Sequence, residues 1–270
     1  MSLKALGNSA RRLRKRRFLR VTTEFQHRSM KPDDIAATPA QQEFERLGPW
    51  MSRFAIDGVL FGGEYDYSTD PRLHRLARCL GSLGGKRVLE LGALEGGHTL
   101  ELARAGATVV AIEGRSINYE RCLFIKRHFR LDSVEFVLAD LRSADFTRYG
   151  RFDAILNSGV LYHLDAPWDL LERLGKAAPR MLLWTHCAPI DQRLEAVEVY
   201  GQQLEGYWYS EVTLDHPLSG KQSLSFWPTR ESLERMLNLT GWSTLAWLDF
   251  DADCPRGPAA TLWAGRSAVC

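Results

Sequence analysis

The feature that most constrains the fold is an apolar run followed by a glycine-rich turn, at Val88–Gly97. Its sequence, VLELGALEGG, predicts a buried strand, a tight turn and the start of a helix. Glycines let the backbone approach a ligand closely, and a helix N-terminus favours polar or anionic groups. The segment therefore predicts an α/β fold that binds a ligand at a strand end.

Short apolar runs and helical stretches alternate through residues 86–187. We expect strands at 87–91, 108–113, 134–138, 152–157 and 180–185, and helices at 96–105, 117–129 and 167–177. Runs without polar alternation suit strands buried on both faces, and strand–helix alternation gives right-handed crossovers. The pattern therefore predicts a mainly parallel sheet with helices on both faces. A helix at 229–240 and strands at 243–249 and 259–266 would complete it.

The chain divides into five segments by composition. We expect a basic tail at 1–30, an N-terminal helical cap at 31–85, a core at 86–187, an aromatic-rich insertion at 188–228 and a C-terminal completion of the core sheet at 229–270. The insertion holds six aromatic residues, Tyr200, Tyr207, Trp208, Tyr209, Phe226 and Trp227. It is expected to form a lid over the acceptor or to pack as an inserted subdomain.

Charge is concentrated in the tail. Eight basic residues precede the first acid, Glu24, whereas residues 21–270 hold 27 basic and 33 acidic residues. The tail suits an amphipathic helix that contacts RNA or anionic lipid, or a frayed terminus. The mildly acidic remainder does not favour nucleic acid as the main partner.

Composition narrows the class of protein. With 45% hydrophobic and 25% charged residues, the chain is typical of a globular domain. No stretch approaches the roughly 18 apolar residues of a membrane span, so no integral membrane segment is expected. Five scattered cysteines without CxxC, and no H-E-x-x-H, favour a reducing, cytoplasmic location and no metal site. The sequence leaves the oligomeric state open.

Three acids follow or end successive predicted strands: Glu90, Glu113 and Asp140. The carboxyl ends of parallel strands are where open α/β sheets bind ligands. Glu90 would attract an amino group, Glu113 would accept both hydroxyls of a ribose, and Asp140 would accept from an adenine amino group. A dinucleotide site is disfavoured, because Leu94 replaces the middle glycine of G-x-G-x-x-G and Glu90 would repel phosphate. An NAD-dependent oxidoreductase is therefore a disfavoured alternative.

With these residues, the chain resembles the class I S-adenosylmethionine-dependent methyltransferases over roughly 86–187. Glu90-Leu91-Gly92-x-x-x-Gly96 matches the family's first motif. The resemblance implies a Rossmann-like seven-stranded sheet with an antiparallel last strand, and S-adenosylmethionine as cofactor. It also implies that the turn Gly92–Gly96, with Ala93, holds the methionine part and Glu113 binds the ribose. Asp140 and the Leu141 backbone would bind adenine.

The segment Asn157–Leu164, NSGVLYHL, narrows the resemblance. It is similar to the G-V-L-Y-H segment of tRNA wobble-uridine oxyacetate methyl/carboxymethyl transferases. The resemblance implies that Tyr162 lines the cofactor's reactive end, and Asn157 at the strand end is also predicted to bind cofactor. No lysine lies between Lys31 and Lys86. A carboxylated cofactor needs a cation near its extra carboxylate, so we expect plain S-adenosylmethionine.

Methyl transfer depends mainly on positioning the nucleophile, and a hydroxyl nucleophile also benefits from a base. His163 is the first candidate for a catalytic base and His186 the second. The alternative role for His163 is a structural hydrogen bond. We expect O-methylation of a small-molecule acceptor. A tRNA acceptor contacted through the basic tail and a non-catalytic module that senses the cofactor are the alternatives.

Overall fold

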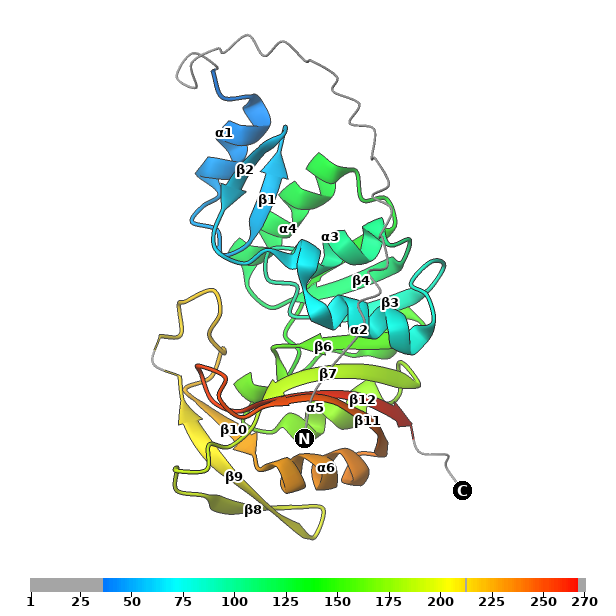
Figure 1. The fold of residues 1–270 in the computed structure, drawn as a ribbon, viewed down its shortest axis with the longest axis vertical. Coiled ribbons are helices and arrows are strands. Elements are labelled where there is room, and N and C mark those ends of the chain that lie inside the picture. The colour runs from blue at the N-terminus through cyan, green and yellow to red at the C-terminus, as the bar shows by residue number, and fades with distance from the viewer. Residues whose placement is uncertain (1–35, 212, 267–270) are drawn as a thin grey trace, which may run out of the picture. The chain divides into compact units, whose positions relative to one another are not determined.

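The structure is a computed structural model, and it describes residues 36–211 and 213–266. Its centre is a seven-stranded sheet (Figure 1). The strands are β3 (Arg87–Leu91), β4 (Thr108–Glu113), β5 (Val134–Leu138), β6 (Ala154–Ser158), β7 (Arg180–His186), β11 (Trp242–Asp251) and β12 (Ala259–Arg266). Their order is β11-β12-β7-β6-β3-β4-β5, with β12 antiparallel to both its neighbours. The predicted sheet and its antiparallel last strand are thus confirmed.

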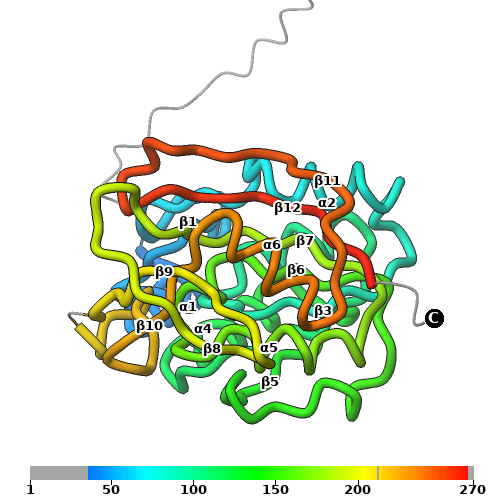
Figure 2. The backbone as a smooth tube through the Cα atoms, turned by 90° about the horizontal axis from the view of Figure 1, so that it is seen from below, coloured from blue at the N-terminus to red at the C-terminus, as the bar shows by residue number. Residues whose placement is uncertain are grey.

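Helices cover both faces of this sheet, as the strand–helix alternation predicts. They are α2 (Pro71–Leu80), α3 (Gly97–Arg104), α4 (Ser116–Phe129), α5 (Pro167–Leu174) and α6 (Arg230–Leu239). Alternate residues of β3 point to opposite faces. Leu89 and Leu91 belong to a core shared with α5 and α6, whereas Val88 belongs to one shared with α2, α3 and α4. Figure 2 shows the sheet from below, with β11 and β12 at one edge and β5 at the other.

The strand order reverses between β3 and β6. The chain passes from β3 to β4 on one side and later returns to place β6 on the other side. In an open α/β sheet this reversal leaves a crevice at the carboxyl ends of the two strands, where ligands bind. The topology therefore places a ligand site at the end of β3, which is where the glycine-rich turn lies.

The N-terminal segment contains more than the predicted helix. It forms α1 (Pro39–Arg46), a hairpin of β1 (Arg53–Ile56) and β2 (Val59–Gly62), a 3₁₀ turn (Tyr67–Thr69) and α2. Glu95, in the turn after β3, is fully buried and accepts from the Met51 and Ser52 amides at 2.6–3.0 Å. It also pairs with buried Arg121 at 3.0 Å. Glu95 therefore attaches the hairpin segment to the core.

The aromatic-rich insertion is a separate antiparallel sheet of β8 (Glu195–Val199), β9 (Gln202–Ser210) and β10 (Leu224–Pro228), in the order β10-β9-β8. Phe226 and Leu204 are fully buried and belong to the same core as α5 and α6. The Phe226 amide donates to the Leu164 carbonyl at 2.8 Å. These residues thus pack as part of the core, and closure of the insertion over an acceptor stays a prediction.

The basic tail at 1–30 lies outside the described residues. In the part of the chain that the structure describes, no helix is long and apolar enough to cross a membrane. Two further 3₁₀ turns lie along the chain before and after β6, at Phe146–Tyr149 and Leu161–His163.

Candidate active site

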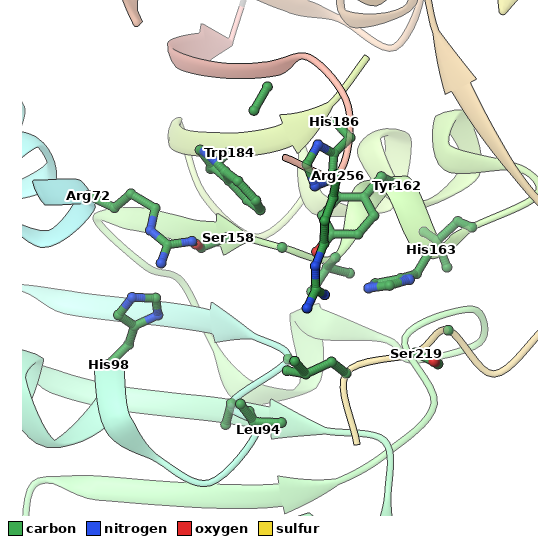
Figure 3. Close-up of a pocket in the computed structure, with 18 of the residues that line it drawn as sticks. Arg72, Leu94, His98, Ser158, Tyr162, His163, Trp184, His186, Ser219 and Arg256 are labelled. Atoms are coloured by element: carbon green, nitrogen blue, oxygen red, sulfur yellow. The ribbon is translucent and has the colours of Figure 1, made fainter. Parts of the chain in front are cut away.

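A cavity of about 680 Å³ lies at the carboxyl ends of β3, β4 and β6 (Figure 3). Its walls come from several parts of the chain: the glycine-rich turn with His98, residues 65–75, 113–115, 140–142 and 158–164, Trp184 and His186, the loop 217–222, and residues 249–261 at and around the turn between β11 and β12. The predicted residues Gly92, Ala93, Glu113, Asp140, Leu141, Tyr162 and His163 all line it. The structure therefore brings most of the predicted site residues into one cavity.

The glycine-rich turn has a conformation that most residues avoid. Gly92 has φ +67° and Gly96 has φ +84°. A Cβ on Gly92 would lie 2.6 Å from Val160 Cγ2, so the turn can pack this closely only with glycine there. Leu94 itself has φ +54°, and its amide donates to Glu113 Oε2 at 2.8 Å. The end of β4 thus holds the turn in place.

Glu113 is buried without a cation. Its carboxylate accepts from the amides of Leu94 and Arg115 at 2.8 and 2.9 Å, and from Asn118 Nδ2 at 3.4 Å. No described residue forms a salt bridge with it. Burial raises the pKa of Glu113, against the opposing effect of these hydrogen bonds. Glu113 also lines the cavity, and a carboxylate is the kind of acceptor that ribose hydroxyls require.

Asp140 is paired within the protein. Arg142 donates to it in bidentate fashion, with Nε at 3.0 Å from Oδ1 and Nη2 at 2.5 Å from Oδ2. Lys221 lies 3.7 Å away. Hydrogen bonds from Arg142 hold the pKa of Asp140 well below its usual range. An adenine amino group would therefore meet a carboxylate that is already ionised and fixed in orientation.

Glu90, Gly96 and Asn157 are absent from the described residues that line the cavity. The Glu90 carboxylate is 1% exposed and accepts from Thr99 Oγ1 at 2.5 Å, and burial raises its pKa to about 8. Asn157 is fully buried and its Oδ1 has no partner among the described residues. Cofactor contacts of these three residues stay predictions.

His163 forms a short pair with a residue that the sequence did not single out. Its Nδ1 lies 2.5 Å from Glu211 Oε1, and the Glu211 side chain is 5% exposed. Since a carboxylate only accepts, Nδ1 carries the hydrogen, and in the neutral ring Nε2 is then the acceptor. The His163 ring lies 4.2 Å from that of Tyr162, measured between centroids. Glu211 directly follows β9 and lies 48 residues after His163 in the sequence, so no local pattern connects the two residues.

A second cluster missed by the sequence reasoning surrounds Asp70, the N-cap of α2. Arg72 pairs with its carboxylate, and His98 Nε2 lies 2.9 Å from Oδ2. Although burial raises it, hydrogen bonds from His98 and Arg72 hold the pKa of Asp70 well below its usual range. Arg72 Nη1 also donates to Ser158 Oγ at 2.8 Å. The cluster joins α2, α3 and the end of β6 beside the glycine-rich turn.

The cavity contains arginine side chains, which the search for lysines between Lys31 and Lys86 did not consider. Arg72 and Arg256 both line the cavity. Arg256 belongs to the turn between β11 and β12 and forms no salt bridge with any described residue. The absence of lysine between Lys31 and Lys86 therefore does not leave the cavity without a cation.

Comparison with known proteins identifies the family. The model of a methyltransferase domain matches residues 63–246, about two thirds of the chain. The N-terminal domain of EvdMO1, solved in the presence of S-adenosylhomocysteine (SAH) and D-fucose, superposes with a TM-score of 0.71. It is 28% identical, and the match covers 84% of this chain and 94% of that one. A methyltransferase from Burkholderia thailandensis, 19% identical with a TM-score of 0.52, shares the fold.

Relatives among curated proteins cover less of the chain. The tRNA U34 carboxymethyltransferase of Methylococcus capsulatus is 34% identical over 145 residues, and that of Alcanivorax borkumensis 32% over 160. The match to the Methylococcus protein covers 53% of this chain and 44% of the relative's length. The chain thus spans less than half of these relatives. From the matched domain, the sheet order and the shared fold, the chain belongs to the class I S-adenosylmethionine-dependent methyltransferases.

Proposed function

We propose that this protein transfers a methyl group from S-adenosylmethionine to a hydroxyl of a small polyhydroxylated acceptor. The carrying observation is the His163–Glu211 pair: Nε2 of His163 has no hydrogen-bond partner among the described residues, and His163 lines a cavity together with most of the predicted cofactor residues. Likeness to the EvdMO1 domain over 84% of this chain supports a sugar-like acceptor, since that domain was solved with D-fucose.

The residues of the cavity fit the cofactor. Glu113, buried and without a cation among the described residues, would accept the ribose hydroxyls, and the Gly92–Ala93 turn would pass beside the methionine part. Arg72 would contact the methionine carboxylate, because its Nη1 and Nη2 each keep a hydrogen beyond those given to Ser158 and Asp70. S-adenosylmethionine, when bound, supplies an activated methyl group on a sulfonium.

His163 would act on the acceptor. As the acceptor oxygen bonds to the methyl carbon and the carbon–sulfur bond breaks, Nε2 takes the hydroxyl proton. Glu211 holds the ring in the tautomer with Nδ1 protonated and stabilises the imidazolium that forms. The products are SAH and a methyl ether, and the proton then passes to solvent.

A tRNA acceptor is the second candidate. The tRNA U34 carboxymethyltransferases are similar over about half of this chain. Arg256, which forms no salt bridge with any described residue, would provide a cation for a carboxylated cofactor. Against it stands the mildly acidic composition of residues 21–270.

Transfer of labelled methyl from S-adenosylmethionine tests the proposal. The acceptors are neutral hexoses and 6-deoxyhexoses, D-fucose among them, and unmodified tRNA at low and high salt. We expect a methylated sugar, and a loss of turnover of roughly 10²- to 10⁴-fold in His163→Asn with SAH affinity nearly intact. His74→Asn, at an exposed histidine of α2, is the control. Transfer to tRNA alone, with a steep loss of binding at high salt, would contradict the proposal.

A further inference from the structure

His186, at the end of β7, has one ring nitrogen committed to the protein. It is 2% exposed, and its Nδ1 lies 2.9 Å from the Gly257 carbonyl oxygen. A carbonyl oxygen only accepts, so Nδ1 carries a hydrogen. In the neutral ring, Nε2 is then a hydrogen-bond acceptor. Nε2 has no hydrogen-bond partner among the described residues, although His186 lines the cavity.

Aromatic neighbours fix the orientation of this ring. It stacks on Trp227 at 4.9 Å with an interplanar angle of 12°, and its centroid lies 4.6 Å from that of Tyr162. His163 contacts the same Tyr162 ring. Figure 3 shows His186, Tyr162 and His163 together along one part of the pocket. Two imidazoles, each with Nδ1 bonded to the protein, thus flank the tyrosine at the acceptor end.

His163 and His186 differ in the group that accepts the hydrogen bond from Nδ1. Glu211, a carboxylate, stabilises a proton on His163, whereas His186 has only a neutral carbonyl. Burial lowers the pKa of His186, against the opposing effect of its hydrogen bonds to the Gly257 and Pro258 carbonyls, and this favours the neutral ring. In the neutral ring Nε2 accepts a hydrogen bond.

We propose that His186 is a specificity-determining residue whose Nε2 accepts a hydrogen bond from a second hydroxyl of the acceptor, one that is not methylated. This inference rests on the proposed function. It restricts the acceptor to molecules, such as sugars, that carry a second hydroxyl close to the hydroxyl that is methylated. An acceptor without the second hydroxyl leaves Nε2 unpaired, which costs binding.

Calorimetric measurement of sugar binding to the SAH-loaded full chain tests the proposed hydrogen bond to His186. The probes are the neutral sugars named above, followed by the monodeoxy analogues of the one that binds most tightly. We expect one analogue to bind wild type about tenfold more weakly than the parent sugar. His186→Asn keeps a donor near Nδ1 but lacks Nε2. It should bind the parent about tenfold more weakly and no longer distinguish it from that analogue.

His186→Gln places an amide oxygen near the Nε2 position and should recover part of the affinity. His74→Asn is the control, and thermal unfolding verifies that each variant is folded. Equal weakening of parent and every analogue in His186→Asn, or no weakening, would overturn the role of His186. Failure of wild type to bind any of the sugars would instead contradict the proposed acceptor class.

Discussion

At the residue scale, Glu90 carries a buried carboxyl whose only hydrogen-bond partner among the described residues is Thr99. Burial raises its pKa from an ordinary 4.5 to about 8. The folded chain therefore keeps a proton that the unfolded chain releases. The stability from this proton is fully present below pH 4.5 and is lost as the pH rises through 8.

Glu90→Gln should remove this dependence, because the amide stays neutral and its oxygen still accepts from Thr99. We expect urea midpoints of variant and wild type to agree near pH 4.5 and the variant to become relatively more stable toward pH 8.5. Curves that stay parallel across this range would show that Glu90 does not titrate there.

Substitution of Arg72 should affect binding of the amino-acid part of the cofactor and not binding of its adenosine part. Arg72→Gln should weaken SAH binding by roughly 10- to 100-fold, because a charge-assisted contact to the carboxylate is lost. Binding of 5′-methylthioadenosine, which lacks the amino-acid part, should not change. Arg75→Gln is the matched control, since Arg75 also lines the cavity but pairs with Asp249. Equal loss for both ligands would assign Arg72 a structural role.

At the element scale, the insertion sheet and its loop complete the site. Glu211 follows β9, and the loop leading to β10 packs against it. A Cβ on Gly220 would lie 2.9 Å from Glu211 Oε1 and 3.0 Å from the His163 carbonyl oxygen. The loop therefore needs glycine at this point for the His163–Glu211 pair to form.

Gly220→Ala should consequently displace Glu211 and lower kcat about tenfold, with SAH affinity unchanged. Gly84→Ala is the control, because its Cβ would make only ordinary contacts, none closer than 3.4 Å. The measurement is kcat for sugar methylation, together with SAH affinity, in both variants. Unchanged kcat in Gly220→Ala would mean that the pair tolerates the displacement or is not used.

At the scale of the whole molecule, apolar runs between helical stretches predicted the strands of the central sheet, and the family resemblance implied seven strands with an antiparallel last one. Neither the pattern nor the resemblance could place Glu211, Asp70 or Arg256 in the site. Asp70 and Arg256 line the cavity, and Glu211 contacts His163, which lines it. Long-range packing brings them there from the N-terminal segment, the last turn and the insertion. Predictions at strand ends therefore named residues that line the cavity, His163 among them, whereas Glu211, Asp70 and Arg256 required the fold.

The N-terminal hairpin must stay attached to the core for the cavity to keep its shape. Glu95 and Arg121 attach the hairpin segment to the turn that follows β3, through a buried pair and two backbone amides. Because the hairpin leads directly into Tyr67, Asp70 and Arg72, the geometry of the cavity depends on this attachment.

Calorimetric titration of SAH and of its 2′-deoxy analogue into wild type and Glu113→Ala tests whether Glu113 binds the ribose of the cofactor. If Glu113 binds the ribose at the end of β4, wild type should favour SAH by roughly 10- to 150-fold, and the variant should bind both ligands weakly and almost equally. Wild type that binds the two ligands alike, or a folded variant that still prefers SAH, would contradict the claim.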